Sequence, residues 1–381
     1  MFTESTTVLF EELDTDNGVK IGRAKLTKVS ALNALDLGMI ESLYAQLNIW
    51  QQDQCIALIL LDAEGDKAFC AGGDVVSMYH LMKQAQSHVV QTDCDEYILQ
   101  RFFTLEYRLN HLIHTYSKPI IVWGNGIVMG GGLGLMCGAS HRIVTASSRI
   151  AMPEISIGLY PDVGASYFLN KMPLGCGLFL GLTGAAINAA DALYANLADY
   201  FVSQDLKTEF VSCLLSATWE TTSVDTTLNT LCDIFQTKNS DDLPLGHLES
   251  RQNWLNGLSQ LRSVKEAVNY IQSIDPQQDS WFERSQKTLS RGSAISAHIL
   301  YEQLRRGKTM TLSECLQMEL GLSCKSGKFG EFQEGVRALL VDKDGKPNWK
   351  YKTVEEVPDS VVEYFFEAIW PADLHPLAHL T

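Results

Sequence analysis

Two short glycine-rich segments, each placed directly after an apolar run, constrain the fold of this chain most strongly. Residues 67–74 read KAFCAGGD after CIALILLDAEG, and residues 130–132 are three glycines after IIVWGNGIVM. Glycine lets the main chain reach positive φ and lets another molecule approach backbone N–H groups, because no Cβ is present. Two such turns side by side would aim two N–H donors at one carbonyl oxygen, as acyl chemistry requires. Each segment taken alone is equally compatible with an ordinary tight turn.

The patterns around these turns predict a mixed α/β fold. Residues 8–13 and 19–27 predict a β-hairpin, because two strand-like runs flank a turn at Asp14 to Gly18. Residues 36–53 carry apolar side chains at spacings of three and four, which predicts an amphipathic helix. The continuous apolar run at residues 55–65 is typical of a buried parallel strand. A strand, helix, strand order favours a β-α-β crossover.

The second half of the chain has a different character. From residue 204 to residue 322 nearly every segment predicts a helix, with polar breaks between the segments. We therefore expect an α/β core with the active site over residues 1–204, and a mostly helical C-terminal region that completes the ligand pocket over residues 205–381. A helix is also expected from Glu334 to Leu340, before a turn at DKDG.

Composition excludes several classes of protein. The net charge of −15 disfavours non-specific nucleic-acid binding, and no apolar run approaches the ~18 residues of a membrane helix. Nine scattered cysteines without a CxxC pair predict reduced thiols and no metal site. The acidic N-terminus lacks the basic and apolar regions of a leader, so a cytoplasmic location is expected.

Two acidic residues follow the triple glycine in a segment otherwise poor in acids. Glu154 lies between apolar residues in PEISIG, and Asp162 comes eight residues later. Burial would raise the pKa of such a carboxyl and make it useful as a base or a nucleophile. Two surface acids are the plainer interpretation of the same residues.

Three ordered motifs resemble the crotonase superfamily: KAFCAGGD at 67–74, GIVMGGGLGL at 126–135 and AMPEISIGLYPDVGASYFL at 151–169. The segments EYRLN at 106–110 and FGEFQEGVRALLVDKDGKPNW at 329–349 narrow the resemblance to the thioester hydrolases of that superfamily. The likeness spans essentially the whole chain. It implies a crotonase-like spiral of ββα units, with two roughly perpendicular sheets and a helical C-terminal region.

The resemblance also implies roles for five residues. The main-chain amides of Gly73 and Gly131 would form the oxyanion hole for a thioester carbonyl. Glu154 and Asp162 match the acids of the family's PE and PD motifs and would be catalytic. Glu106 matches a further acid at the substrate pocket. Whether Glu154 attacks the carbonyl itself or activates water stays open.

One departure from the wider superfamily bears on the reaction. Hydratases carry a second glutamate shortly after the triple glycine, and this chain has Gly134 there. Loss of that acid–base partner would cost roughly 10²–10⁴ in rate, so hydration of a double bond should be poor. Gly134 together with Asp162 selects hydrolysis.

A second departure lies in the loop that contacts coenzyme A in the superfamily. The usual arginine-proline-lysine is replaced by Lys28, Val29 and Ser30. The expected coenzyme A contacts are then Lys28, Ala31, Leu32 and Ala71. No metal and no separate cofactor are expected, because coenzyme A is part of the substrate and of the product.

The resemblance therefore implies hydrolysis of a short 3-hydroxyacyl-CoA, with 3-hydroxyisobutyryl-CoA of valine catabolism as the expected substrate. Three alternatives stay open: an enoyl-CoA hydratase or isomerase, a non-catalytic structural or ribosome-associated relative, and an acyl-CoA binding module. The expected partner is the acyl-CoA, without nucleic acid or membrane, and a homo-oligomer stays open beside a monomer.

Overall fold

The computed structural model describes residues 7–87, 94–220, 223–238 and 240–380, which form two compact units. Both units are built from three separate segments: unit 1 from 1–73, 109–150 and 187–249, and unit 2 from 74–108, 151–186 and 250–381. The predicted division was a single cut after residue 204. The observed units alternate along the chain instead, and the helices between 205 and 249 belong to unit 1.

Unit 1 contains a six-stranded sheet in the order β1-β2-β3-β5-β7-β9. Its strands are β1 (Val8–Asp14), β2 (Lys20–Leu26), β3 (Ile56–Ala63), β5 (Ile120–Gly124), β7 (His141–Val144) and β9 (Tyr200–Phe201). The first two strands pair antiparallel, which confirms the predicted hairpin, and each later neighbour pairs parallel. β3 lies inside the sheet and is almost wholly buried, as its continuous apolar run predicts.

A second sheet has three strands in the order β4-β6-β8. They are β4 (Ala68–Cys70), β6 (Ile127–Met129) and β8 (Arg149–Ala151). β4 and β6 pair parallel, with Ala68 opposite Ile127 and Cys70 opposite Val128. Because parallel strands end on the same edge of a sheet, the segments that follow β4 and β6 leave that edge together.

The helices of unit 1 are α1 (Leu37–Gln52), α4 (Gly131–Cys137), α7 (Ala189–Tyr194), α8 (Lys207–Ser216) and α9 (Val224–Lys238). The two longest of them are α1 and α9, with 16 and 15 residues. α1 confirms the helix predicted over residues 36–53, and Asp36 caps it by accepting from the Met39 amide at 2.9 Å. Phe210 of α8 and Phe235 of α9 pack with Trp123 of β5 in one buried cluster, which explains why these two helices join unit 1.

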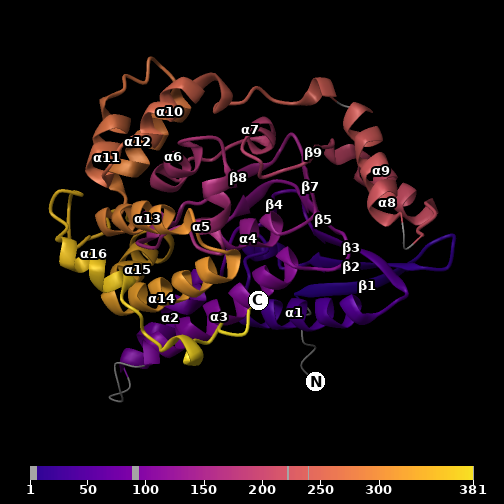
Figure 1. The fold of residues 1–381 in the computed structure, drawn as a ribbon, viewed down its shortest axis with the longest axis horizontal. Coiled ribbons are helices and arrows are strands. Elements are labelled where there is room, and N and C mark those ends of the chain that lie inside the picture. Colours follow the sequence, from indigo (N-terminus) through magenta and orange to yellow (C-terminus); the bar gives the residue numbers. More distant parts are fainter. Residues whose placement is uncertain (1–6, 88–93, 221–222, 239, 381) are drawn as a thin grey trace. The chain divides into compact units, whose positions relative to one another are not determined.

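Unit 2 is mainly helical. Its helices are α2 (Val75–Ser87), α5 (Ala165–Phe168), α6 (Cys176–Thr183), α10 (Gln252–Ser259), α11 (Val264–Ser273), α12 (Ser280–Arg291), α13 (Ala294–Gly307), α14 (Leu312–Phe329), α15 (Glu331–Val336) and α16 (Asp359–Phe366). α3 (Cys94–His114) continues past the division after residue 108. Figure 1 shows α10 and α12 beside α6. There the Phe179 ring packs edge-on against Trp254, tilted against Trp281 and stacked against Phe282.

Two local predictions in unit 2 have clear outcomes. Asp74 caps α2 as predicted, since its side chain accepts from the Ser77 amide at 3.1 Å. The helix expected from Glu334 to Leu340 exists, but it divides into the end of α15 and a π-helical segment at Arg337–Val341. Among the described residues, no helix combines the length and the apolar character needed to cross a bilayer.

Candidate active site

The two glycine turns lie side by side in unit 1. A Cβ added to Gly72 would lie 3.3 Å from the Met129 carbonyl oxygen and 3.8 Å from the Gly131 nitrogen. Gly72 has φ of 110°, which an L side chain rarely adopts, so the AGGD turn needs glycine for both conformation and space. The turns after β4 and β6 are therefore neighbours, which is the arrangement that the oxyanion-hole hypothesis requires.

The amides of both predicted donors take no part in the backbone hydrogen bonds of their turns within the described residues. Gly131 is the first residue of α4, and the first amides of a helix have no acceptor within it. Within the described ranges, no backbone carbonyl accepts from the amide of Gly73 or of Gly131. These amides are thus available to a ligand carbonyl, and their role as an oxyanion hole stays a prediction.

The loop predicted to contact coenzyme A is tied to the AGGD turn. The Leu32 carbonyl accepts from the Ala71 amide at 3.0 Å, and the Leu35 amide donates to the Gly72 carbonyl at 2.8 Å. The buried Asn33 side chain donates to the Ala68 carbonyl at 3.0 Å. The structure thus brings Leu32 and Ala71 together as one rigid surface, within which Ala31 ends the 3₁₀ turn Val29–Ala31.

Lys28 is less free than its position in the sequence suggests. Its ammonium lies 2.9 Å from the carboxylate of Asp36, the residue that caps α1. Both side chains are partly exposed, so this ion pair contributes little to stability. Any contact of Lys28 with a phosphate would therefore compete with Asp36.

The three predicted acids all belong to unit 2 and are all buried. Glu106 lies on α3, Glu154 opens the 3₁₀ turn Glu154–Ile157, and Asp162 precedes α5; their exposed fractions are 2 %, 5 % and 4 %. The plainer interpretation of Glu154 and Asp162 as surface acids is therefore wrong. Apolar neighbours in PEISIG do predict this burial, as the sequence argument held.

Close backbone contacts fix the turn that carries Glu154. A Cβ on Gly158 would lie 2.3 Å from the Glu331 carbonyl oxygen, and one on Gly335 would lie 2.3 Å from the Ile157 carbonyl carbon. Both values are far inside normal contact, so each position admits only glycine without movement of backbone. The segment 154–158 therefore packs directly on α15, and this packing buries Glu154.

Burial changes the acidity of the three carboxyls. It raises the pKa of Glu154 well above its ordinary value, and the charge of Asp162 adds to this increase. Burial also raises the pKa of Glu106 well above its ordinary value, with the charges of Asp162 and Glu154 adding to it. For Asp162 burial raises the pKa to about 7, against the opposing hydrogen bond from Tyr107. Carboxyls of this kind can exchange protons near neutral pH.

Two of the carboxyl oxygens lack partners among the described residues. Oε1 of Glu106 and Oε2 of Glu154 are buried and accept no hydrogen bond. A buried oxygen without a donor costs free energy, on the order of 1–3 kcal/mol. Such atoms are expected where a substrate hydroxyl or a water molecule supplies the missing donor.

Four further polar residues surround Asp162 that sequence reasoning missed: Tyr107, Tyr160, Ser323 and Glu319. The Tyr107 hydroxyl donates to Asp162 Oδ2 at 2.7 Å. Both oxygens of Glu319 accept backbone amides just after Asp162, from Gly164 at 2.7 Å and Ser166 at 2.8 Å. The only sequence signals were the positions of Tyr107 in EYRLN and of Tyr160 in YPD.

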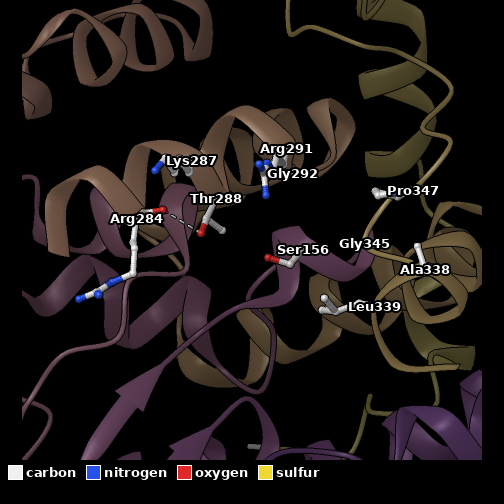
Figure 2. Close-up of a pocket in the computed structure, with 10 residues that line it drawn as sticks. All are labelled: Ser156, Arg284, Lys287, Thr288, Arg291, Gly292, Ala338, Leu339, Gly345 and Pro347. Carbon is white, nitrogen blue, oxygen red and sulfur yellow. Dashed lines mark hydrogen bonds between the residues drawn. The ribbon is translucent and has the colours of Figure 1, made fainter. Parts of the chain in front are cut away.

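A separate pocket of about 370 Å³ lies in unit 2 (Figure 2). Its lining combines three basic side chains of α12 with small and apolar groups: Ser156, Arg284, Lys287, Thr288, Arg291, Gly292, Ala338, Leu339, Gly345 and Pro347. None of the predicted site residues lines it. Among the described residues, no three His, Cys, Asp or Glu side chains are grouped so that they could hold a metal ion.

The comparisons with known proteins address the family. The model of the family described as "Enoyl-CoA hydratase/isomerase" matches residues 21–366. This chain belongs to that family. The match includes both glycine turns and all three buried acids.

Curated members of the family resemble this chain over nearly its whole length. The 3-hydroxyisobutyryl-CoA hydrolase of Xenopus tropicalis is 34% identical over 94% of this chain and 92% of its own length. The Bos taurus protein of the same name is 36% identical over 93% of this chain and 88% of its own length. The narrower resemblance to hydrolases, first seen in EYRLN and the C-terminal segment, is thereby confirmed.

Solved structures of the family share the fold. An enoyl-CoA hydratase from Rhodobacter sphaeroides has a TM-score of 0.79 and 31% identity, and it covers 96% of this chain and 98% of its own. A carnitinyl-CoA dehydratase from Mycobacterium thermoresistibile has the same TM-score and 30% identity over the same shares. The predicted crotonase-like fold with a helical C-terminal region is confirmed.

Proposed function

We propose that this protein hydrolyses the thioester of a short 3-hydroxyacyl-CoA, and that 3-hydroxyisobutyryl-CoA is its substrate. The observation that carries the proposal is the cluster of three buried carboxyls, Glu106, Glu154 and Asp162, in a family member whose α4 has glycine at position 134. The names of the curated relatives support the same reaction and the same acyl group. Valine catabolism is the corresponding pathway.

In this proposal the amides of Gly73 and Gly131 donate to the thioester oxygen. Each donor stabilises the transition state by roughly 3 kcal/mol. Glu154 either attacks the carbonyl carbon to form a mixed anhydride or removes a proton from the attacking water. The C–S bond then breaks with its electron pair on sulfur, and water supplies the hydroxyl of the acid and the proton of the thiol.

Asp162 and Glu106 position the acyl group. Asp162 bonds the substrate hydroxyl or the water and helps to position the leaving thiolate, and Glu106 orients the hydroxyacyl end. The unpartnered oxygens Glu106 Oε1 and Glu154 Oε2 support contacts of this kind. Lys28, Ala31, Leu32 and Ala71 would contact coenzyme A. No cofactor or metal takes part in the proposed reaction.

The test is release of free thiol from 3-hydroxyisobutyryl-CoA and 3-hydroxypropionyl-CoA by the wild type, Glu154→Gln and Asp162→Asn. We expect turnover by the wild type and a loss of 10²-fold or more in kcat for Glu154→Gln. Glu283→Gln removes an exposed acid paired with Lys287 and serves as the control with unchanged kinetics. Near wild-type hydrolysis by Glu154→Gln would refute the assigned role.

The second candidate is hydration of an enoyl-CoA, which the names of the two solved relatives favour. Loss of enoyl absorbance without release of thiol would identify this reaction. Affinity for acyl-CoA with neither signal would identify a binding module, and co-purification with ribosomes without thiol release would identify a non-catalytic relative. Gly134 argues against hydration, because the second acid of that reaction is missing.

The location and assembly of the protein belong to the same proposal. The curated relatives are named as mitochondrial, so they give no support to the predicted cytoplasmic location. We retain the acyl-CoA as the partner, without nucleic acid or membrane. Size-exclusion chromatography with light scattering decides between a monomer and the homo-oligomer left open above.

A further inference from the structure

A continuous chain of hydroxyl groups runs from Asp162 into the interior of unit 2. The Tyr107 hydroxyl lies 2.7 Å from Asp162 Oδ2 and 2.8 Å from the Ser323 hydroxyl. The Ser323 hydroxyl lies 2.7 Å from that of Tyr160, which in turn donates to the backbone carbonyl of Glu319 at 2.5 Å. All of these residues are buried, with Ser323 and Tyr160 fully so. These hydroxyl groups therefore have little contact with bulk solvent.

The number of protons in the chain is informative. It contains four oxygen–oxygen contacts, and each contact is a hydrogen bond only if one proton lies in it. The three hydroxyls of Tyr107, Ser323 and Tyr160 supply one proton each. The Glu319 carbonyl at the far end can only accept. The fourth proton must come from the carboxyl of Asp162.

An ionised Asp162 leaves one contact without a proton. Tyr107 then donates to the carboxylate and Tyr160 donates to the Glu319 carbonyl, so that Ser323 can satisfy only one of its two neighbours. Two oxygens would face each other at less than 3 Å with no proton between them. With Asp162 protonated, its carboxyl donates to the Tyr107 hydroxyl instead of accepting from it. All four hydrogen bonds then run in one direction and every group is satisfied.

We propose that the hydroxyl chain Tyr107–Ser323–Tyr160 holds Asp162 in its protonated form, so that Asp162 adds no negative charge beside Glu154. This inference rests on the proposed function for the role of Glu154. The three hydroxyl residues are positioning residues, since they act through Asp162.

The surroundings of Asp162 favour the same state. Among the described residues, the titratable groups that interact with it electrostatically are Glu106 and Tyr107 from α3, Glu154 from its 3₁₀ turn, Tyr160, and Glu319 from α14. None of these groups is a cation. From α13 the neutral Gln303 donates to the Pro161 carbonyl beside it. Like charges that share a buried site disfavour simultaneous ionisation, so one neutral member assists ionisation of another.

A raised pKa at Asp162 is consistent with this geometry, because burial moves the pKa of its carboxyl to about 7. The charge of Asp162 also raises the pKa of Glu154. Neutral Asp162 removes that contribution. Its other oxygen then acts purely as an acceptor, which suits a substrate hydroxyl or a water molecule that needs a partner.

The test substitutes residues of the hydroxyl chain that do not contact Asp162 directly. Tyr160→Phe and Ser323→Ala each remove the contact that lacks a proton when Asp162 is ionised, so both variants favour ionisation. The acid dissociation constant of Asp162 should rise about tenfold in each, which corresponds to one hydrogen bond of roughly 1.4 kcal/mol. If Tyr107 instead donates permanently to a carboxylate, Ser323→Ala should lower that constant and Tyr160→Phe should not raise it.

The readout is the infrared carbonyl band of a protonated carboxyl, followed from pH 5 to 9 in the full-length protein. The Asp162 band is assigned as the one lost in Asp162→Asn. Tyr301→Phe is the matched control, because its hydroxyl also donates to a backbone carbonyl, that of Leu261, outside the hydroxyl chain. Circular dichroism checks that each variant is folded.

The expected result is a protonated Asp162 band at neutral pH in the wild type and in Tyr301→Phe, with its titration moved to lower pH in both chain variants. If the Asp162 band of folded Tyr160→Phe and Ser323→Ala titrates at the same pH as in the wild type, or at a higher pH, the proposal is overturned. The band reports protonation without substrate. Failure of the hydroxyl chain is therefore distinguishable from failure of the hydrolase assignment, which the thiol assay tests separately.

Discussion

Replacement of Gly132 by alanine tests whether close packing of α4 on β4 sets the oxyanion donors. A Cβ on Gly132 would lie 2.3 Å from the Cys70 carbonyl oxygen and 2.7 Å from the Cys70 Cβ. Ordinary contact begins near 3.4 Å, so the first turn of α4 must move away from β4 by about 1 Å. Gly131 precedes the substituted residue and moves with it.

The expected loss follows from that displacement. A misplacement of about 1 Å at a catalytic group costs roughly 10²-fold, and loss of one oxyanion donor costs roughly 10²–10³-fold in kcat. We therefore expect Gly132→Ala to lower kcat about 100-fold. KM should change little, because the three atoms nearest to the added Cβ all belong to Cys70 and none belongs to Leu32 or Ala71. Overpacking should also destabilise the fold by about 1–3 kcal/mol.

The assay is steady-state thiol release, with thermal unfolding followed by circular dichroism. Gly321→Ala is the control, since it lies inside α14 and an added Cβ meets no atom within 4 Å. Alanine there should stabilise the protein by up to about 1 kcal/mol and leave kcat unchanged. If Gly132→Ala is folded and retains kcat within about threefold of the wild type, the close approach of α4 and β4 does not position the donors.

Three further predictions concern stability and binding. For Asp162 the pKa is 3.8 in the unfolded chain and about 7 in the folded one, so the folded state binds more protons between these values and loses stability as pH rises through them. Asp162→Asn should abolish this loss of stability, which is worth on the order of 4 kcal/mol. Thermal melts at pH 4 and pH 8 test this, and an equal difference between the two melting temperatures in wild type and variant would contradict it. Asn33→Ala removes donors to two backbone carbonyls, those of Glu64 and Ala68, and should destabilise by about 1–3 kcal/mol while raising KM; an unchanged melt contradicts this. Lys28→Ala breaks the partly exposed ion pair with Asp36. We expect the free energy of unfolding, measured by chemical denaturation, to fall by less than about 1 kcal/mol, and KM to rise. An unchanged KM excludes Lys28 from coenzyme A binding.

The local elements of the fold were largely predictable from residue patterns. The apolar run at 55–65 became β3 inside a parallel sheet, and the spacing of Leu43, Leu47 and Trp50 became the buried face of α1. These predictions succeed because periodicity reports which side of one element is buried. Asp74 was recognised as a cap for the same local reason.

The membership of helices in units was not predictable from such patterns. α8 and α9 have ordinary apolar stripes, and nothing in those stripes says which surface they cover. Phe210 of α8 packs against Trp123, almost ninety residues earlier in the chain, and Phe235 of α9 packs against Phe210. Residues 205–249 therefore join unit 1. The predicted boundary at residue 204 was placed where the secondary structure changes from mixed to helical. Compact units are instead defined by long-range packing.

The residues of the candidate site show the same contrast. Glu154, Asp162 and the glycines can be identified from the sequence, because acids among apolar residues and repeated glycines need a chemical or conformational reason. Ser323 does not, since an isolated serine in a helical pattern carries no signal, and it meets Tyr107 across 216 positions of sequence. Yet the protonation of Asp162 depends on that contact in our proposal. The acids are therefore the part of the site that sequence can identify, while the distribution of charge among them is decided by partners that only the folded chain brings together.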